Sequence, residues 1–298
     1  MTWQMLITEW SFDLPVVIGV LLAGILYARG LHGALTIVGA RRTRRRWQAM
    51  AFYAGLCTVF VALESPLDAH VEQFFWVHMT QHVLLIMLAA PLLALGDAGV
   101  PILHGVPLAV RRPALSTLAH HPMLRRLGRA LSWLNGPRQV LFLFLVDIYL
   151  WHWNWLFTLT LRNQVVHDLE HLCFLGFGFL FWSQVVDQRM IHTSLSYLLR
   201  SGYVILAAFS SNFLAMYFVF APRALFAPYA SIHPRPYGMS ALTDQQLAGA
   251  IMWVPVMFLF GAAFVVCFFK WLGEEEAAVT PPYRVAAVPR TSDTARFP

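Results

Sequence analysis

The sequence predicts an all-α integral membrane protein with about seven transmembrane helices. Of its 298 residues, 58% are hydrophobic and only 12% are charged, whereas about 25% of the residues in a soluble domain are charged. The apolar residues occur in runs of about 20 without the alternation typical of strands. A soluble protein of this length could not cover so much apolar surface, so a soluble globular enzyme and a disordered chain are both excluded.

The apolar segments are each long enough to cross a bilayer as a helix. They lie near residues 14–38, 47–64, 74–95, 139–159, 165–186, 195–220 and 246–271. Only a few residues around Arg162 and Asn163 separate the fourth segment from the fifth. These two segments are therefore expected to form a tight helical hairpin.

The arginines predict the orientation of these helices, because positive charge concentrates in the cytoplasmic loops of membrane proteins. Five arginines lie within residues 41–46 and six lie within residues 111–138, on one side of the predicted topology. The opposite side has only Arg162, Arg223 and Arg235. We therefore expect the N-terminus outside and the C-terminus in the cytoplasm. The net charge of +6 is then loop charge that orients the protein in the lipid bilayer, and no nucleic-acid partner is expected.

The chain divides into a polytopic membrane domain, residues 1–273, and a flexible cytoplasmic tail, residues 274–298, which is rich in proline and alanine. Within the membrane domain, residues 96–138 mix arginine with leucine at roughly helical spacing, which indicates a segment in the cytoplasmic membrane interface. The cysteines, Cys57, Cys173 and Cys267, form no C-x-x-C pair. No metal site built from thiolates is therefore indicated.

Two pairs of histidines occur at the same spacing on two different helices. His78 and His82 belong to HMTQH in the third segment, and His167 and His171 belong to HDLEH in the fifth. A spacing of four residues places both imidazoles on one helical face. Both segments are expected to begin at the outer side, which gives the pairs matching depths of roughly 5 and 10 Å. His152 in the fourth segment also lies about 10 Å deep.

A buried histidine is costly in hydrocarbon without a partner, so these five residues form a candidate metal or haem site near the outer face. The alternative is a set of interhelical hydrogen bonds. Imidazole suits copper, zinc and iron, and a nearby thioether would favour Cu(I). Met79 and Met252 fall in the same layer, although Met79 faces away from the two histidines of its own helix. Asp147 is the one carboxylate near the midplane, with either a functional role or an interhelical hydrogen bond.

HDLEH also matches the H-x-x-E-H signature of zinc proteases, in which the glutamate activates a zinc-bound water. The third segment, however, carries Gln81 where HDLEH has Glu170. Because glutamine cannot act as a general base, the shared feature is the histidine pair, and Glu170 is expected to orient an imidazole. An intramembrane zinc hydrolase stays open as a weaker alternative, and a bis-histidine haem redox protein is another.

Four strings carry a resemblance to a known family. They are ESPLD, HMTQHVLLIMLAAPLLALG, WHWNWLFTLTLRNQVVHDLEHLCFLGFGFLFW and LTDQQLAGAIMWVP, and together they extend over most of the membrane domain. In these strings the chain resembles the CtaG family of membrane cytochrome c oxidase assembly factors, of the seven-helix type. An unrelated single-span copper chaperone with cysteine ligands shares that name, but this chain lacks its motif. The positions that match the family are His78, Gln81, His82, Trp151, His152, Asn163, His167, Glu170, His171, Asp244, Gln245 and Gln246.

The resemblance implies a non-enzymatic, multi-pass protein of the bacterial cytoplasmic membrane that helps to mature the oxidase at its copper centre. It would bind copper, as Cu(I), through the outer histidines and pass it to the large subunit of cytochrome c oxidase. Extracytoplasmic copper carriers would be further partners. Gln81 and Glu170 would hold the ligands in place without binding the metal, and so would Asp244, Gln245 and Gln246 at the outer end of the seventh segment.

Overall fold

The computed structural model describes residues 9–33, 41–234 and 236–279, and within these residues the chain forms helices and no strands. Six helical stretches are long and apolar enough to cross a membrane. They are Leu14–His32, Thr43–His70, Phe75–Leu95, Gln164–Val185, Tyr197–Phe220 and Ala241–Val279. A seventh crossing results if the bent pair α9 (Pro137–Trp151) and α10 (Asn154–Thr160) counts as one span. The predicted all-α architecture with several membrane-length helices is therefore confirmed.

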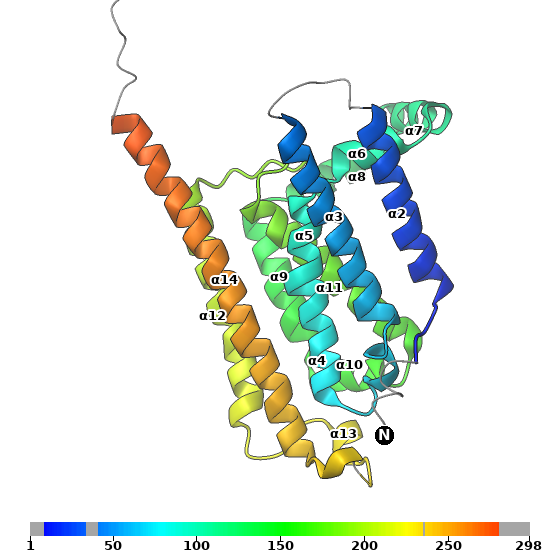
Figure 1. Cartoon of the computed structure of the whole chain (residues 1–298), viewed down its shortest axis with the longest axis vertical. Coiled ribbons are helices and arrows are strands. Elements are labelled where there is room, and N and C mark those ends of the chain that lie inside the picture. The colour runs from blue at the N-terminus through cyan, green and yellow to red at the C-terminus, as the bar shows by residue number, and fades with distance from the viewer. Residues whose placement is uncertain (1–8, 34–40, 235, 280–298) are drawn as a thin grey trace, which may run out of the picture.

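The long helices lie side by side in one bundle (Figure 1). They are α2 (Leu14–Gly33), α3 (Arg41–Glu64), α11 (Gln164–Val185), α12 (Tyr197–Phe220) and α14 (Ala241–Val279). A further span consists of three consecutive pieces, α4 (Phe75–Val83), the π-helical turn η2 (Leu84–Ala89) and α5 (Ala90–Leu95). Large hydrophobic side chains such as Phe209, Phe213 and Phe258 are exposed on the outside of the bundle, as expected where lipid rather than water surrounds a protein.

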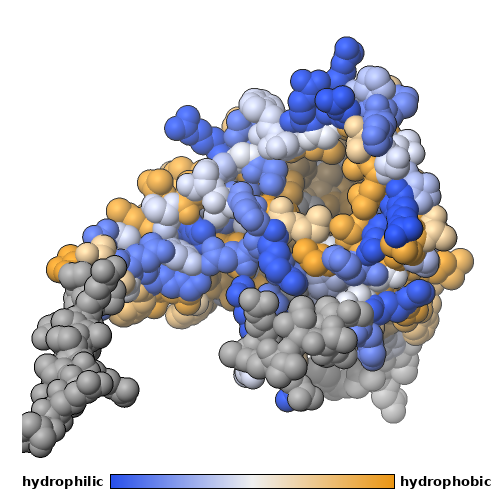
Figure 2. Space-filling view, turned by 90° about the horizontal axis from the view of Figure 1, so that it is seen from above, coloured by the Kyte–Doolittle hydropathy of each residue, from blue (hydrophilic) through white to orange (hydrophobic). Residues whose placement is uncertain are grey.

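The arginine-rich segments gather at one end of the bundle. In Figure 1, the start of α3 and the helices α6 (Gly99–Gly105), α7 (Leu108–His120) and α8 (Pro122–Leu134) lie at the end where α14 finishes. The start of α2, α10 and the short helix α13 (Ala227–Ala230) lie at the other end. Figure 2 looks onto the arginine-rich end and shows many hydrophilic residues there, with hydrophobic residues along the sides. Loops predicted to share a side of the membrane therefore do share an end of the bundle.

The segment 96–138 contains three short helices, and only the first is held tightly. A Cβ atom on Gly30 of α2 would lie 1.8 Å from the carbonyl oxygen of Pro101, and one on Gly105 would lie 1.9 Å from that of Leu26. The backbones of α2 and α6 thus approach so closely that only glycine fits at either position. By contrast, no residue of α7 or α8 is buried, as expected for helices in the membrane interface.

The fourth predicted span, residues 139–159, is not a straight helix, and the prediction is wrong at this point. Helix α9 ends at Trp151, and α10 is bent away from it by 75°. Trp153 between them has an extended backbone, with φ −69° and ψ 127°. The side chain of Asn154 donates a hydrogen bond of 2.6 Å to the carbonyl oxygen of Leu225. The break is thus held by a loop far away in the sequence, and no proline or glycine between residues 151 and 154 signals it.

Helices α3 and α14 extend further than the sequence predicts. Helix α3 already begins at Arg41, so the arginines of residues 41–46 lie in its first turns rather than in a loop. Helix α14 continues to Val279, so residues 274–279 of the predicted tail are helical. Residues 280–298 of that tail, and residues 34–38 of the first predicted span, lie outside the described residues. The flexible tail stays a prediction for residues 280–298.

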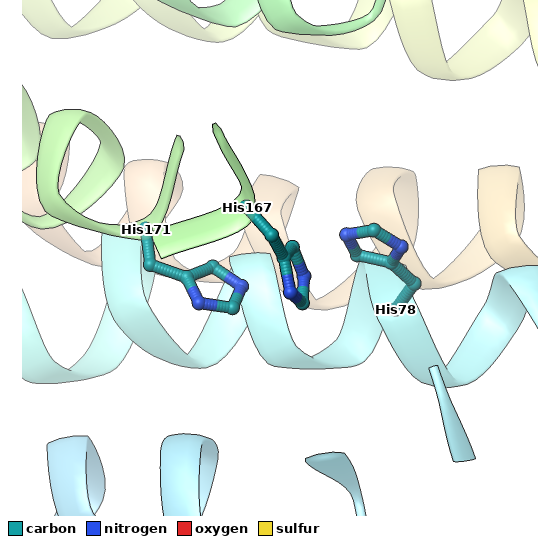
Figure 3. Close-up of side chains that lie close together, drawn as sticks. All are labelled: His78, His167 and His171. Atoms are coloured by element: carbon teal, nitrogen blue, oxygen red, sulfur yellow. The ribbon is translucent and has the colours of Figure 1, made fainter. Parts of the chain in front are cut away.

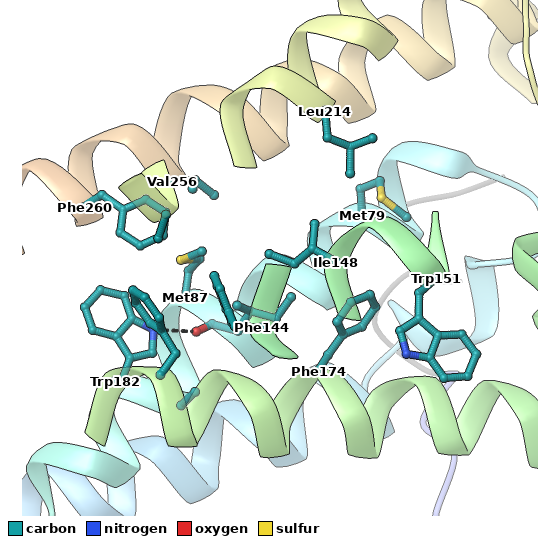
Figure 4. Close-up of a cluster of buried hydrophobic side chains, with 14 of the residues drawn as sticks. Met79, Met87, Phe144, Ile148, Trp151, Phe174, Trp182, Leu214, Val256 and Phe260 are labelled. Atoms are coloured by element: carbon teal, nitrogen blue, oxygen red, sulfur yellow. Dashed lines mark hydrogen bonds between the residues drawn. The ribbon is translucent and has the colours of Figure 1, made fainter. Parts of the chain in front are cut away.

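Aromatic side chains fill the core between α9, α11, α14 and the π-helical turn (Figure 4). The rings of Phe144 and Phe181 are stacked with centroids 4.4 Å apart, and Trp182 stacks on Phe260 at 5.7 Å. The indole nitrogen of Trp182 donates a hydrogen bond of 2.9 Å to the carbonyl oxygen of Ile86 in the π-helical turn. This contact holds α11 against the span that begins with α4. These two segments carry the two histidine pairs.

Candidate metal centre

Both histidine-bearing helices begin one turn before their first histidine, at the same end of the bundle. The carboxylate of Asp244 accepts hydrogen bonds from the backbone N–H groups of Phe75 and Trp76, at 3.1 and 3.0 Å, and so caps α4. The side chain of Asn163 caps α11 by accepting from the N–H of Val166 at 3.3 Å. His78 and His167 each follow three residues after the first residue of their helix. The equal depth of the two pairs therefore follows from two matched helix starts.

The four paired imidazoles converge between α4 and α11. Ring centroids are 4.4 Å apart for His78 and His82, and 4.2 Å apart for His167 and His171. Across the two helices, the His78 ring lies 5.0 Å from that of His167, and the His82 ring lies 5.6 Å from that of His171. Figure 3 shows His78, His167 and His171 directed into the same space. All four residues are buried, so the predicted face-to-face arrangement of the pairs is present.

Glu170 lies inside this group rather than beside it. Its oxygen Oε2 is 3.6 Å from Nε2 of His78, and Oε1 is 3.7 Å from Nε2 of His82. The potential ligand atoms of His78, His82 and Glu170 all lie within 4.8 Å of one another, and the same holds for His78, His167 and His171. Both sets are compact enough to surround a single metal ion, given metal–nitrogen and metal–oxygen bonds of about 2.0–2.2 Å.

These ligand atoms lack hydrogen-bond partners within the described residues. The buried, unpartnered atoms are Nε2 of His78, both ring nitrogens of His82, Nε2 of His167, Nε2 of His171 and both carboxylate oxygens of Glu170. Leaving a buried polar atom unsatisfied costs about 1–3 kcal/mol, and among the described residues 16 buried side-chain atoms lack a partner. Seven of them in one place indicate that the group is built to hold something. A cation would be satisfied by one lone-pair nitrogen from each imidazole and by the carboxylate oxygens, while the second ring nitrogen of His82 carries the proton of the neutral ring.

The hydrogen bonds of Tyr229 determine which nitrogen of His78 points into the group. The hydroxyl of Tyr229 donates to the carbonyl oxygen of Val71 at 2.5 Å. Its oxygen therefore accepts from Nδ1–H of His78, which lies 3.1 Å away. In a neutral imidazole the other nitrogen then has a free lone pair, and Nε2 of His78 is the atom that faces Glu170. Sequence reasoning missed Tyr229, because it lies in a short helix with no motif that marks it.

His152 lies next to the group but outside its compact part. It follows the last residue of α9, and its ring centroid is 6.1 Å from that of His82. Its Nδ1 donates to the carbonyl oxygen of Ile148 at 2.7 Å, and its Nε2 lies 3.2 Å from the sulfur of Met79. The structure therefore brings four of the five predicted histidines into one group, and the fifth, His152, lies beside this group. Met79 of α4 meets the fifth, and it lines a small cavity together with His82, so the prediction that it faces away from both histidines of its own helix is wrong for His82.

Comparison with known proteins identifies the family of this chain. Residues 16–274 match the family described as cytochrome c oxidase caa3 assembly factor (Caa3_CtaG). The chain belongs to this family. The match covers the whole bundle, including both histidine pairs, and it confirms the resemblance seen in the sequence. The family indicates a cytochrome c oxidase assembly factor.

Relatives of this chain occur in mycobacteria. An uncharacterized protein of Mycobacterium leprae is 24% identical over 255 residues, which make up 83% of this chain and 37% of that protein. An uncharacterized protein of Mycobacterium bovis is 25% identical over 256 residues, with the same two shares. The chain thus spans well under half the length of these relatives. No solved structure matches the chain significantly.

Three of the remaining family positions hold the helices of the bundle in place. The amide of Gln81 donates to the carbonyl oxygen of Ala62 and to Asp68, both at 2.9 Å, so it joins α4 to α3 and to the turn that follows α3. Gln245 accepts from the N–H of Leu225 at 2.7 Å and so anchors the loop after α12. Asp244 caps α4 as described, whereas Gln246 is exposed. Gln81 and Asp244 thus act on the histidines by fixing the helix that carries them.

Trp151 and Asp147 form one local contact. The indole nitrogen of Trp151 donates to Oδ1 of Asp147 at 2.8 Å, one turn earlier on the same helix. The sequence left open whether Asp147 has a functional role or bonds to another helix. The hydrogen bond in the structure is within α9, and it satisfies one oxygen of a buried carboxylate near the midplane.

Proposed function

We propose that this chain is a non-enzymatic assembly factor of the bacterial cytoplasmic membrane that binds copper as Cu(I) and passes it to the large subunit of cytochrome c oxidase. The observation that carries the proposal is the group of buried ligand atoms without hydrogen-bond partners on His78, His82, His167, Glu170 and His171. Imidazole nitrogens suit copper, and copper is a metal that the oxidase needs. In this proposal Glu170 is a ligand, because its carboxylate oxygens lie 3.6 and 3.7 Å from the Nε2 atoms of His78 and His82.

The packing around the imidazoles favours an ion over a haem. The ring of Phe157 lies 5.1 Å from that of His78, and the ring of Phe174 lies 4.5 Å from that of His82. These side chains take up space beside the imidazoles that a porphyrin would need. The position of Glu170 also disfavours a zinc hydrolase, since a carboxylate among the ligands is poorly placed to act as a base on a bound water.

A polar pocket supports loading from the end of the bundle that carries α10. It has a volume of about 250 Å³, and its lining includes Glu72, Asn163, Gln164 and His167. The side-chain oxygens of Glu72 and Asn163 suit a hydrated cation. Among the described residues of the lining, Arg162 is the one basic side chain besides His167, which belongs both to this pocket and to the metal centre. In the proposed orientation this end is extracytoplasmic, which would let an extracytoplasmic copper carrier deliver the ion.

Copper binding by purified protein tests the proposal. We expect one Cu(I) per chain at the metal centre, and each of His78→Ala, His82→Ala, His167→Ala and His171→Ala should weaken binding by about 10-fold or more, because each removes a ligand from one shared site. His120→Ala is the matched control, since His120 is exposed at the end of α7. The measurement is competition with a Cu(I) chelator, together with an optical spectrum. Unchanged affinity in all four variants, or a Soret band with stoichiometric iron, would contradict the proposal.

The orientation is tested separately with reporter fusions. A fusion after Arg129, in α8, should report the cytoplasm, and a fusion near Tyr229, in α13, should report the outside. The reason is the excess of arginine at the end of the bundle that carries α8. Alkaline phosphatase activity and fluorescent-protein brightness give opposite signals on the two sides. The reverse pattern would place the metal centre near the cytoplasm and would contradict delivery from outside.

A further inference from the structure

We propose that Met79, Met252 and His152 form a second, softer copper site beside the metal centre, through which Cu(I) leaves toward the protein surface. This inference rests on the proposed function, because it gives the bound copper a second position. The two sites differ in donor atoms. The metal centre offers imidazole nitrogens and a carboxylate, whereas the second site offers thioether sulfurs and one imidazole nitrogen, a set that selects Cu(I) over divalent ions.

Three methionines and two histidines line one small cavity. Its volume is about 40 Å³, and its lining includes Met79, Met87, Met252, His82 and His152. These side chains come from α4, the π-helical turn, α14 and the end of α9. A cavity of this size accepts a single ion or one water molecule. Figure 4 shows Met79 beside Ile148 and Leu214, and Met87 near Val256 and Phe260, so apolar groups make up the rest of the surroundings.

The contact between His152 and Met79 brings two lone-pair donors together. Nδ1 of His152 lies 2.7 Å from the carbonyl oxygen of Ile148, and because a carbonyl only accepts, Nδ1 carries the proton. In the neutral ring Nε2 then presents a lone pair, yet it lies 3.2 Å from the sulfur of Met79, which also presents lone pairs. With bonds of about 2.0 Å to nitrogen and about 2.3 Å to sulfur, one metal ion with a tetrahedral bond angle joins atoms about 3.5 Å apart. The observed 3.2 Å is close to this value, so the two side chains need to separate only slightly to share an ion.

The position of this cavity links the metal centre to the outside of the bundle. His82 contributes to the metal centre and also lines the cavity, so an ion can move between the sites by exchanging one ligand at a time. His152 lines the cavity and also a groove of about 700 Å³ on the surface, together with Trp153, Phe213 and Tyr217. The break between α9 and α10 thus places one imidazole where it touches both spaces. A site with sulfur ligands at this point would hold Cu(I) on its way out.

The test uses the full chain in detergent, with Ag(I) as a soft monovalent probe and Zn(II) as a probe of the metal centre. The double variant Met79→Leu, Met252→Leu removes both sulfurs with little change in volume. We expect its Ag(I) affinity to fall about 10-fold or more while Zn(II) affinity stays unchanged, because thioethers contribute to one site only. Met50→Leu is the matched control, since Met50 is exposed on α3, and it should change neither affinity.

X-ray absorption at the copper edge gives a second, independent readout. Wild-type protein loaded with two equivalents of Cu(I) should show sulfur at about 2.3 Å, and the double variant should not. If the double variant fails to fold, the single variant Met252→Leu is measured instead, and its sulfur signal should be weaker than that of the wild type. A spectrum of wild-type protein without sulfur, or Ag(I) affinity that the variants leave unchanged, would overturn the second site. Failure of the histidine variants to alter copper binding would instead overturn the proposed function, so the two failures are distinguishable.

Discussion

Cytochrome c oxidase from cells that carry His82→Ala and His171→Ala should contain its haem but little of its copper. The two changes remove one imidazole from each helix of the metal centre, whose rings lie 5.6 Å apart. Each ligand contributes about 10-fold or more to affinity, so the pair should weaken copper binding by more than 10-fold, although losses of ligands that share one ion do not simply add. The assembly factor itself should still accumulate, because removing imidazoles whose nitrogens lack hydrogen-bond partners leaves no new buried group unsatisfied.

The deciding measurement is the ratio of copper to haem in the purified oxidase. Added copper in the growth medium should restore part of the oxidase activity, because a higher ion concentration compensates for weaker binding. Cells that carry His120→Ala should make oxidase with the normal ratio of copper to haem, because His120 is exposed at the end of α7 and does not belong to the metal centre. A fully copper-loaded oxidase from the double variant would contradict delivery through these histidines and leave them a structural role.

Replacing Glu170 with glutamine should stabilise the metal-free protein while weakening its copper binding. The carboxylate is fully buried, and both oxygens lack hydrogen-bond partners within the described residues. An amide avoids the cost of a buried charge and can donate to Nε2 of His78 or His82, so about 1 kcal/mol of stability should be gained. That corresponds to a rise of roughly 2–4 °C in the thermal midpoint. Copper affinity should fall by about 10-fold, since the variant loses a charged ligand.

Thermal melts of the purified protein with and without Cu(I) measure both effects. The wild type should gain more stability from copper than Glu170→Gln does, because the stabilisation grows with the ratio of ion concentration to Kd. Glu64→Gln is the control, since that carboxylate is also buried but accepts from the N–H of Asp13 at 2.9 Å, away from the metal centre. If the glutamine at position 170 lowered the metal-free midpoint and left the copper effect intact, Glu170 would be a structural residue and not a ligand.

The apolar runs and the histidine spacing determined the part of this protein that depends on local sequence. A membrane helix must satisfy its own backbone and carry apolar side chains, so hydropathy alone locates six of the spans. Spacing of four residues places His78 with His82 and His167 with His171 on single faces. Equal distances from the helix starts then predict equal depth, which the matched caps from Asp244 and Asn163 provide. Each of these inferences needs only the geometry of one helix, whereas the cap that Asp244 of α14 provides to α4 is a contact between distant segments.

Tertiary structure alone decided the features that depend on contacts between distant segments. The bend after Trp151 is held by Asn154 on Leu225, and hydropathy cannot signal it because the residues on both sides remain apolar. Tyr229 orients His78 from 151 residues away, and Met79 meets His152 across 73 residues. Glu170 became a candidate ligand only when α4 was packed against α11. The sequence determines which residue types one helix presents. The packing of side chains in the whole bundle determines which atoms of other helices those residues contact.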